Sequence, residues 1–295
     1  MKIVMEQPIK ISHLLSAFKL FNYFQLVFVL SIGILYLNNW LLIIICQMLL
    51  GLIFAHGLEL QHECIHLNMF RSKILNRIFG SLLGLPMLVS YTHYRVQHMY
   101  HHKYLGTEKD AELFNYEESS LKSLNSFILR AWNFARIPSL FDNFSKFIQG
   151  KYPLSFNTYA NKREALLEYF VLTVLFSIAF FVSITNISIL FWKLWLIPWL
   201  LFGEFFHFLI ELPEHIDCDR NDQNIFVNTR SIETNPVVNY LVNGNNYHVE
   251  HHLYPNIPVH NLKLVHEKIK QDIKFLSRSY ITFYYNLFLI KLTVK

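Results

Sequence analysis

The stretch Asn243–Pro255, NGNNYHVEHHLYP, places three histidines within five residues, at His248, His251 and His252. Spacings of three and four residues put side chains on one face of a helix. Imidazole is the commonest metal-binding side chain at neutral pH, so a helix here would present three ligands in one direction. This stretch is central to the interpretation of the chain because its histidine pattern is repeated elsewhere.

Two further histidine clusters precede it. His98, His101 and His102 repeat the His-x-x-His-His spacing within QHMYHHKYLG, and His62 and His66 form a two-histidine version within QHECIHL. Histidine makes up 15 of 295 residues. A given position therefore begins His-x-x-His-His by chance only roughly once in eight thousand. Packing offers no reason to gather eight imidazoles, so these residues indicate a metal site.

The composition indicates a membrane protein. Hydrophobic residues make up 53% of the chain and charged residues only 16%, against roughly 25% charged in soluble domains. The net charge of +5 comes from scattered basic residues without a nucleic-acid-binding motif, so no nucleic-acid partner is expected. The three cysteines show no paired spacing, which argues against a disulfide framework or an iron–sulfur site. We expect residues 1–295 to form a single membrane domain.

Four segments are apolar and close to the roughly 20 residues that span a hydrocarbon core. They are residues 20–37, 40–60, 168–185 and 194–212. We predict an all-α integral membrane fold of two helical hairpins with a helical cap that carries the histidines. The second helix should continue beyond its apolar part as far as His66. Residues 69–89 are apolar but interrupted by charges, glycines and a proline, so we expect an interfacial or re-entrant segment that returns the chain to the same side.

The distribution of basic residues predicts the orientation in the membrane. Of the 26 lysines and arginines, only Lys193 falls in a predicted outer connection. Because positive residues are enriched on the cytoplasmic side, both termini and the histidine clusters are expected there in a multi-pass protein.

The eight clustered histidines are too many for one tetrahedral zinc and suit two ions with four or five ligands each. Iron is the preferred ion because it changes oxidation state and activates O2. The residue types leave manganese or a two-zinc hydrolytic site open. The remaining histidines complete no ligand spacing and are expected to be packed or interfacial: His13, His56, His93, His207, His260 and His266.

Two other functions fit part of the pattern. His62 to His66 spell H-E-x-x-H, which is typical of a metalloprotease with Glu63 as general base. That function would leave both His-x-x-His-His clusters without a role. A non-catalytic metal carrier would distribute its ligands along the membrane spans, whereas these gather at one face.

The three clusters, arranged around two membrane hairpins, resemble those of the membrane fatty acid desaturase family. YRVQHMYHHKYLGTEKDAEL resembles the second histidine box of that family with its downstream acidic residue, here Asp110, and NYHVEHHLYPNIP resembles the third. The segment LPEHIDC resembles one that supplies an additional ligand in related hydroxylases, which makes His215 a ninth candidate.

The resemblance implies two iron ions that use O2 to introduce a double bond into a fatty acyl chain of a membrane lipid. Hydroxylation or ketolation of a lipid, a carotenoid or a small amphiphile remains open, because relatives on the same scaffold catalyse these reactions. The His-Pro-Gly-Gly motif of a fused cytochrome does not occur, so we expect an external electron donor such as ferredoxin or cytochrome b5. Carboxylates that could hold the far ring nitrogens of the ligands are Glu63, Asp110, Glu211, Glu214 and Glu250.

Overall fold

The computed structural model describes residues 11–110, 123–132, 134–185, 189–219 and 221–289. Within these residues, four helices are long and apolar enough to cross a membrane. They are α1 (His13–Tyr36), α2 (Trp40–Ile65), α7 (Tyr159–Ile184) and a helix over Trp192–Glu214. The last comprises two π-helical turns, η3 (Trp192–Leu196) and η4 (Pro198–Gly203), then α8 (Glu204–Glu211) and η5 (Leu212–Glu214).

These helices extend beyond the apolar segments because capping side chains set several of their ends. Ser12 accepts a hydrogen bond from the backbone of Leu15 and begins α1, and Thr158 begins α7 in the same way. As expected, α2 continues past its apolar part, and it ends just before Leu67, which has a left-handed backbone (φ 62°). The sequence marks the apolar part of each helix, whereas the polar turns depend on capping.

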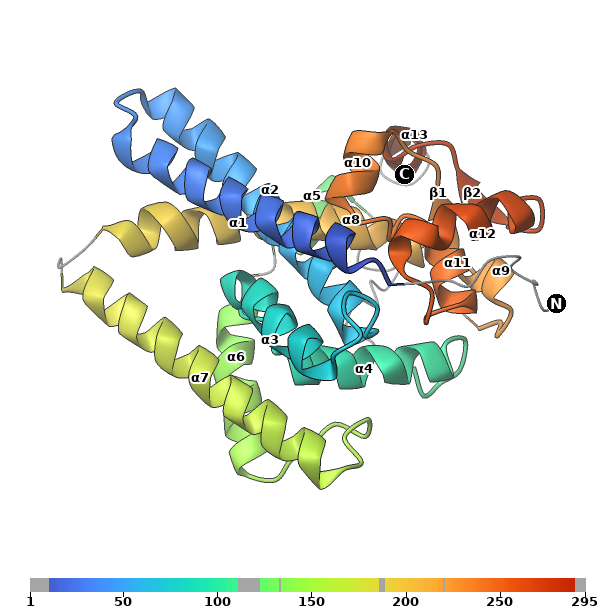
Figure 1. Ribbon diagram of the computed structural model, residues 1–295, viewed down its shortest axis with the longest axis horizontal. Coiled ribbons are helices and arrows are strands. Elements are labelled where there is room, and N and C mark those ends of the chain that lie inside the picture. Colours follow the sequence, from blue (N-terminus) through green and yellow to red (C-terminus); the bar gives the residue numbers. More distant parts are fainter. Residues whose placement is uncertain (1–10, 111–122, 133, 186–188, 220, 290–295) are drawn as a thin grey trace.

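The central element is α2, which packs against α1, α3 (Lys73–Gly84), η4 and α8 (Figure 1). Gly51 makes the contact with η4 possible. A Cβ atom at this position would lie 2.5 Å from Cβ of Phe202 and 2.8 Å from the backbone nitrogen of Gly203. The two helices therefore touch backbone to backbone, which larger side chains would prevent.

The other pair of long helices diverges. The Phe176 ring of α7 contacts Phe191 and Trp195 near one end of the pair. Toward their other ends the two helices separate in Figure 1, and α7 packs instead on α4 (Tyr91–Tyr104) and α6 (Arg136–Ile148).

Between α2 and α7 the chain bends sharply. α3 leads through η1 (Leu85–Met87) into α4, and the axes of the two parts meet at 98°. The bend lets α4 lie beside the last turns of α2, so the second histidine cluster reaches the first.

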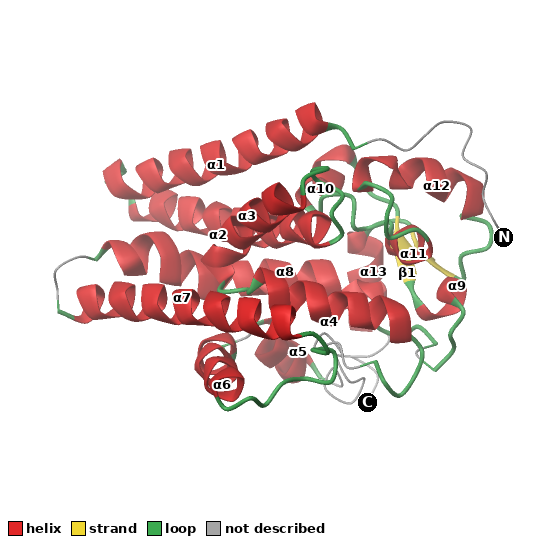
Figure 2. Ribbon diagram, turned by 60° about the horizontal axis from the view of Figure 1, so that its bottom comes forward, coloured by secondary structure: helices red, strands yellow, loops and turns green. Residues whose placement is uncertain are grey.

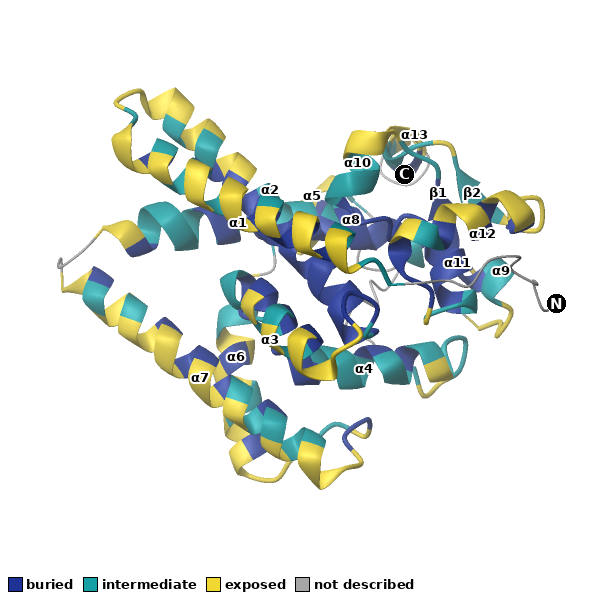
Figure 3. Cartoon of the chain, viewed as in Figure 1, coloured by how far each residue is buried: buried dark blue, intermediate teal, exposed yellow. Residues whose placement is uncertain are grey.

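Exposed apolar side chains mark the surface that faces lipid. Figure 3 shows exposed residues along α1, the first half of α2 and α7, among them Phe28, Ile44 and Phe181. From Ile53 onward every residue of α2 is buried. A large continuous apolar surface on long helices fits a membrane environment, and the polar elements enclose the end of α2.

The polar part consists of short elements (Figure 2). They are α5 (Leu124–Ala131), α9 (Ile225–Asn228), β1 (Arg230–Ile232), α10 (Pro236–Leu241), α11 (His248–Leu253), η6 (Val259–Asn261), α12 (Leu262–Ile269), β2 (Phe275–Ser277) and α13 (Tyr280–Leu287). β1 and β2 form a parallel pair in which Arg230 lies opposite Phe275. The predicted all-α fold lacked this sheet because three-residue strands leave no periodicity to detect.

Candidate metal centre

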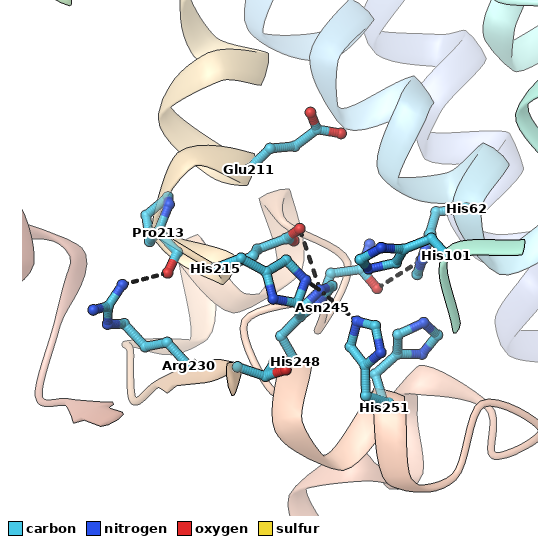
Figure 4. A network of polar contacts seen from close by, with 12 residues as sticks. His62, His101, Glu211, Pro213, His215, Arg230, Asn245, His248 and His251 are labelled. Atoms are coloured by element: carbon cyan, nitrogen blue, oxygen red, sulfur yellow. Dashed lines mark hydrogen bonds and ion pairs between the residues drawn. The ribbon is translucent and has the colours of Figure 1, made fainter. Parts of the chain in front are cut away.

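Nine histidines converge at the polar end of α2. They come from α2 and its C-cap, α4, α11 and the segment after η5, and Figure 4 shows several of their rings facing one another. The structure thus brings together every histidine that the sequence suggested as a ligand: His62, His66, His98, His101, His102, His215, His248, His251 and His252.

The first group holds five imidazoles. One ring nitrogen from each of His62, His66, His98, His102 and His251 lies within 4.8 Å of those of the others. The Nε2 atoms of His62 and His98 are 2.8 Å apart, and His102 Nε2 lies 3.0 Å from the Nε2 atoms of both His98 and His251. Five donors therefore surround one point.

The second group adjoins it. His101, His215 and His252 each offer a nitrogen within 4.8 Å of the others. His248 Nε2 lies 3.2 Å from His215 Nε2 and 3.0 Å from His252 Nε2, so it belongs to this group as a fourth imidazole. A carboxylate oxygen of Glu214 approaches His248 Nε2 to 3.4 Å, on the side of the other ligands.

Hydrogen bonds fix the tautomers of individual ligands. His215 Nδ1 lies 3.0 Å from the carbonyl oxygen of Asn228, which can only accept. His62 Nδ1 lies 3.2 Å from Oδ1 of Asn245, whose amide nitrogen donates elsewhere. In both rings the proton is therefore on Nδ1, and Nε2 directs its lone pair into the cluster.

A carboxylate does the same for the second group. His101 Nδ1 lies 3.0 Å from both oxygens of Asp110, the acidic residue singled out downstream of the second cluster. This contact orients the ring and raises the basicity of its other nitrogen, as carboxylates behind metal-bound histidines do.

These residues fit bound metal ions. Nitrogen lone pairs 2.8–3.2 Å apart repel one another, whereas metal bonds of about 2.0–2.1 Å at right angles place nitrogens about 3 Å apart. The buried Nε2 of His66 has no hydrogen-bond partner among the described residues. Burial and the neighbouring imidazoles hold the pKa of His66, His248, His251 and His252 well below its usual range. The rings are therefore neutral, as ligands must be.

Comparisons with known proteins identify the family. The family model described as fatty acid desaturase matches residues 38–284, which contain all nine histidines. The chain belongs to the fatty acid desaturase family. It is accordingly an oxidoreductase of the desaturase type.

Several characterised relatives are lipid desaturases. The sn-1 oleoyl-lipid 12-desaturase of Picosynechococcus is 25% identical over 265 residues, which cover 79% of this chain and 70% of the relative. Dihydrorhizobitoxine desaturase of Bradyrhizobium elkanii is 24% identical over 235 residues, 75% of this chain and 65% of the relative. The sn-1 acyl-lipid omega-3 desaturase (ferredoxin) of a Nostoc species is 32% identical over 102 residues, 32% of this chain and 28% of the relative.

Two of the expected carboxylates of this desaturase contact other groups instead of the ligand rings. Glu63 accepts hydrogen bonds from Lys19 Nζ at 3.0 Å and Asn243 Nδ2 at 3.2 Å. Lys19 itself is buried and also donates to Asn243 at 2.7 Å. Glu63 therefore fixes α1 and the Asn243 turn to the end of α2.

Glu250 lies on α11 between the ligands but points away from them. It accepts hydrogen bonds from Ser231 Oγ and from Nδ1 of His266, both at 2.6 Å. Burial lowers the pKa of His266, but Glu250 and Glu233 outweigh it, and the net pKa is raised. Glu250 thereby joins α11 to β1 and α12.

Buried polar residues that sequence reasoning missed lie on the membrane side of the centre. Glu59, His207 and Glu211 offer ligand atoms within 4.8 Å of one another. Glu59 accepts a hydrogen bond of 2.6 Å from Nδ2 of Asn245, the residue that orients His62. The spacing held a signal, because Glu59 precedes His62 by three residues and so lies on the same helical face. Glu211, expected behind the boxed histidines, lies 3.3 Å from His207.

Other histidines make separate contacts. His56 Nδ1 lies 2.7 Å from the carbonyl oxygen of Leu241, and Tyr169 donates its hydroxyl to His93 Nδ1 at 2.6 Å.

Arg230 holds the segment that carries the ninth histidine. Its Nη1 donates to the carbonyl oxygens of Pro213 at 2.6 Å and Ile216 at 2.8 Å, on either side of His215, and Figure 4 shows the first of these bonds. The guanidinium also lies over the ring of Phe283. β1 therefore positions both His215, through Arg230 and Asn228, and α11, through Ser231.

Proposed function

We propose that this protein removes one hydrogen from each of two adjacent carbons of a fatty acyl chain in a membrane lipid, with O2 as oxidant and two bound iron ions. The reaction consumes one O2, two electrons and two protons, and yields a carbon–carbon double bond and two waters. The observation that carries the proposal is the division of nine imidazoles into adjoining groups of five and four.

The residues of the chain have defined parts in this proposal. His62, His66, His98, His102 and His251 would hold one ion, and His101, His215, His248 and His252 the other. Bound iron supplies the redox chemistry that activates O2 for the attack on an unactivated methylene. Asp110, Asn245 and the Asn228 carbonyl keep the ligand rings oriented. Exposed apolar helix faces keep the protein in the membrane that holds its substrate.

The relatives support a lipid substrate. Two of them are named for acyl or oleoyl chains of lipids, and a third for a dihydrorhizobitoxine substrate. The last name makes desaturation of a small amphiphile the second candidate, because that relative aligns with 75% of this chain.

The protease alternative loses support from the position of Glu63. A general base for hydrolysis must reach a metal-bound water. Glu63 instead binds Lys19 and Asn243, and the two His-x-x-His-His clusters complete the same centre as His62 and His66.

We also propose that both termini and the metal centre are on the cytoplasmic side. The distribution of lysine and arginine supports this orientation, since Lys193 alone falls at the opposite ends of the long helices. Electrons would come from an external one-electron carrier, and the printed name of the Nostoc relative includes ferredoxin.

The test is purification in detergent, measurement of iron, and incubation with lipid, O2 and a reducing system. We expect about two irons per chain and a product two mass units lighter than its substrate, with the double bond located by mass spectrometry. His101→Ala and His252→Ala should lose iron and turnover. An unchanged iron content and turnover in both variants would refute the proposal, and a product heavier by one oxygen would instead assign hydroxylation.

A further inference from the structure

Two hollows lie on the surface around α4. One, of about 580 Å³, lies between α3, α4 and the start of α7, and the other, of about 600 Å³, lies between the end of α4 and α9. Both are lined by Lys103 and Tyr104, so they form one continuous surface, which we call the α4 face.

The α4 face is basic. Five basic side chains and two carboxylates line its hollows, and Arg77 is already paired with one of the latter, Glu164, at 2.7 Å. The other basic residues form no ion pair with a carboxylate in the part of the chain that the structure describes: Lys73, Arg95, Lys103 and Lys109. Three of them are exposed, and Arg95 is half-buried.

The same face is adjacent to the metal centre. His102, a member of the five-histidine group, is half-buried and lines the second hollow. Leu67, which follows His66 directly, lines the first. Arg95 and Lys103 lie on the helix that carries His98 and His102, and a helix with its side chains is only about 10–12 Å across. Electrons that arrive here would need to cross no more than α4.

We propose that the α4 face is the docking site of the electron donor, an acidic protein that carries one electron at a time. The inference rests on the proposed function, which requires two such electrons for each double bond. Two reduced carriers are oxidised per turnover, and their electrons reach the centre from the side of His102. Electron-transfer complexes are small and transient, and opposite charges guide their formation.

The position of the face favours a protein donor over the anionic headgroup of a lipid substrate. The first hollow lies on the side of α4 that carries Arg95, Met99 and Lys103, positions spaced by four residues. A headgroup bound there would have α4 between itself and the metal ligands, whereas an electron can cross the helix. Tyr100 and Tyr104, whose ring centroids are 4.3 Å apart, add contact area of the kind found in protein interfaces.

The test compares two reductants in the purified full-length protein in lipid nanodiscs. One is an acidic [2Fe–2S] ferredoxin kept reduced by NADPH and its reductase, and the other is dithionite with methyl viologen. The variants are Lys73→Glu and Lys103→Glu. The matched control is Lys263→Glu, an exposed lysine on α12, away from α4 in Figure 1.

Each variant of the α4 face should raise the KM for ferredoxin about fivefold at low salt, because a close charge reversal is worth about 1 kcal/mol at a surface. The rise should disappear near 0.5 M salt, where the Debye length falls to about 4–5 Å. The ratio of ferredoxin-driven to dithionite-driven turnover should fall in both variants but not in Lys263→Glu.

The other outcomes overturn the inference in different ways. Equal KM values for ferredoxin in Lys103→Glu and Lys263→Glu would exclude this face as the docking site. A raised KM for the lipid with both reductants would assign the face to a substrate headgroup. If the unaltered protein formed no product with either reductant, the proposed function itself would fail.

Discussion

Replacing Asp110 with asparagine tests how the second histidine group is held. Asp110 presents both carboxylate oxygens to His101 Nδ1 at 3.0 Å, and the side chains of His101 and Asp110 are only 4% and 11% exposed. Asparagine keeps the shape and one oxygen acceptor but removes the negative charge. Because the contact is buried, solvent screens it little.

The magnitude follows from the kind of hydrogen bond that is lost. A bond to a charged group contributes about 1.5–3 kcal/mol and a neutral one about 0.5–1.5 kcal/mol. The difference of about 1–1.5 kcal/mol corresponds to roughly a five- to tenfold weaker hold on the metal. His101 belongs to the four-histidine group, so Asp110→Asn should weaken that ion and spare the other.

The assay is competition with an iron chelator, followed by metal analysis and turnover. Iron in Asp110→Asn should fall from about two to about one per chain at chelator concentrations that leave the unaltered protein loaded. Asp142→Asn on α6 removes an exposed carboxylate paired with Lys146 and should change nothing. Loss of both ions together, or of neither, would refute the assignment of Asp110 to one group.

Three further predictions concern stability. Gly51→Ala should lower the free energy of unfolding by about 1–3 kcal/mol because the added carbon meets backbone, whereas Gly33→Ala, where it meets the Cys46 side chain at 3.2 Å, should be neutral; equal melting temperatures would contradict this. His266→Gln should cost more at pH 6 than at pH 9. The raised pKa of His266 means that its charged contact with Glu250 is fully present below the ordinary pKa of 6.5 and is lost as pH rises through the folded value, so an equal loss at both values would exclude it. Removal of metal with a chelator should lower the melting temperature, and added iron should restore it, because ions bind only the folded ligand set; an unchanged transition would argue against metal in the centre.

Much of the architecture could be predicted from the sequence. The four apolar segments all became long helices, since length and hydropathy directly report the need to satisfy backbone groups in lipid. The first histidine pair was expected on a continuation of the second helix, and α2 runs to Ile65. The family, too, could be recognised from local histidine spacing, and the family match over residues 38–284 confirms it.

The tertiary structure alone decided how the nine imidazoles divide. Sequence spacing put His98, His101 and His102 in one cluster, but adjacent helical residues point in different directions. His98 and His102 therefore join the five-histidine group and His101 the other. The far ring nitrogens were equally unpredictable, because their partners Asn245 and Asn228 come from loops whose paths depend on long-range packing. Local periodicity fixes which face of a helix a residue occupies, and only the assembled chain fixes what that face meets.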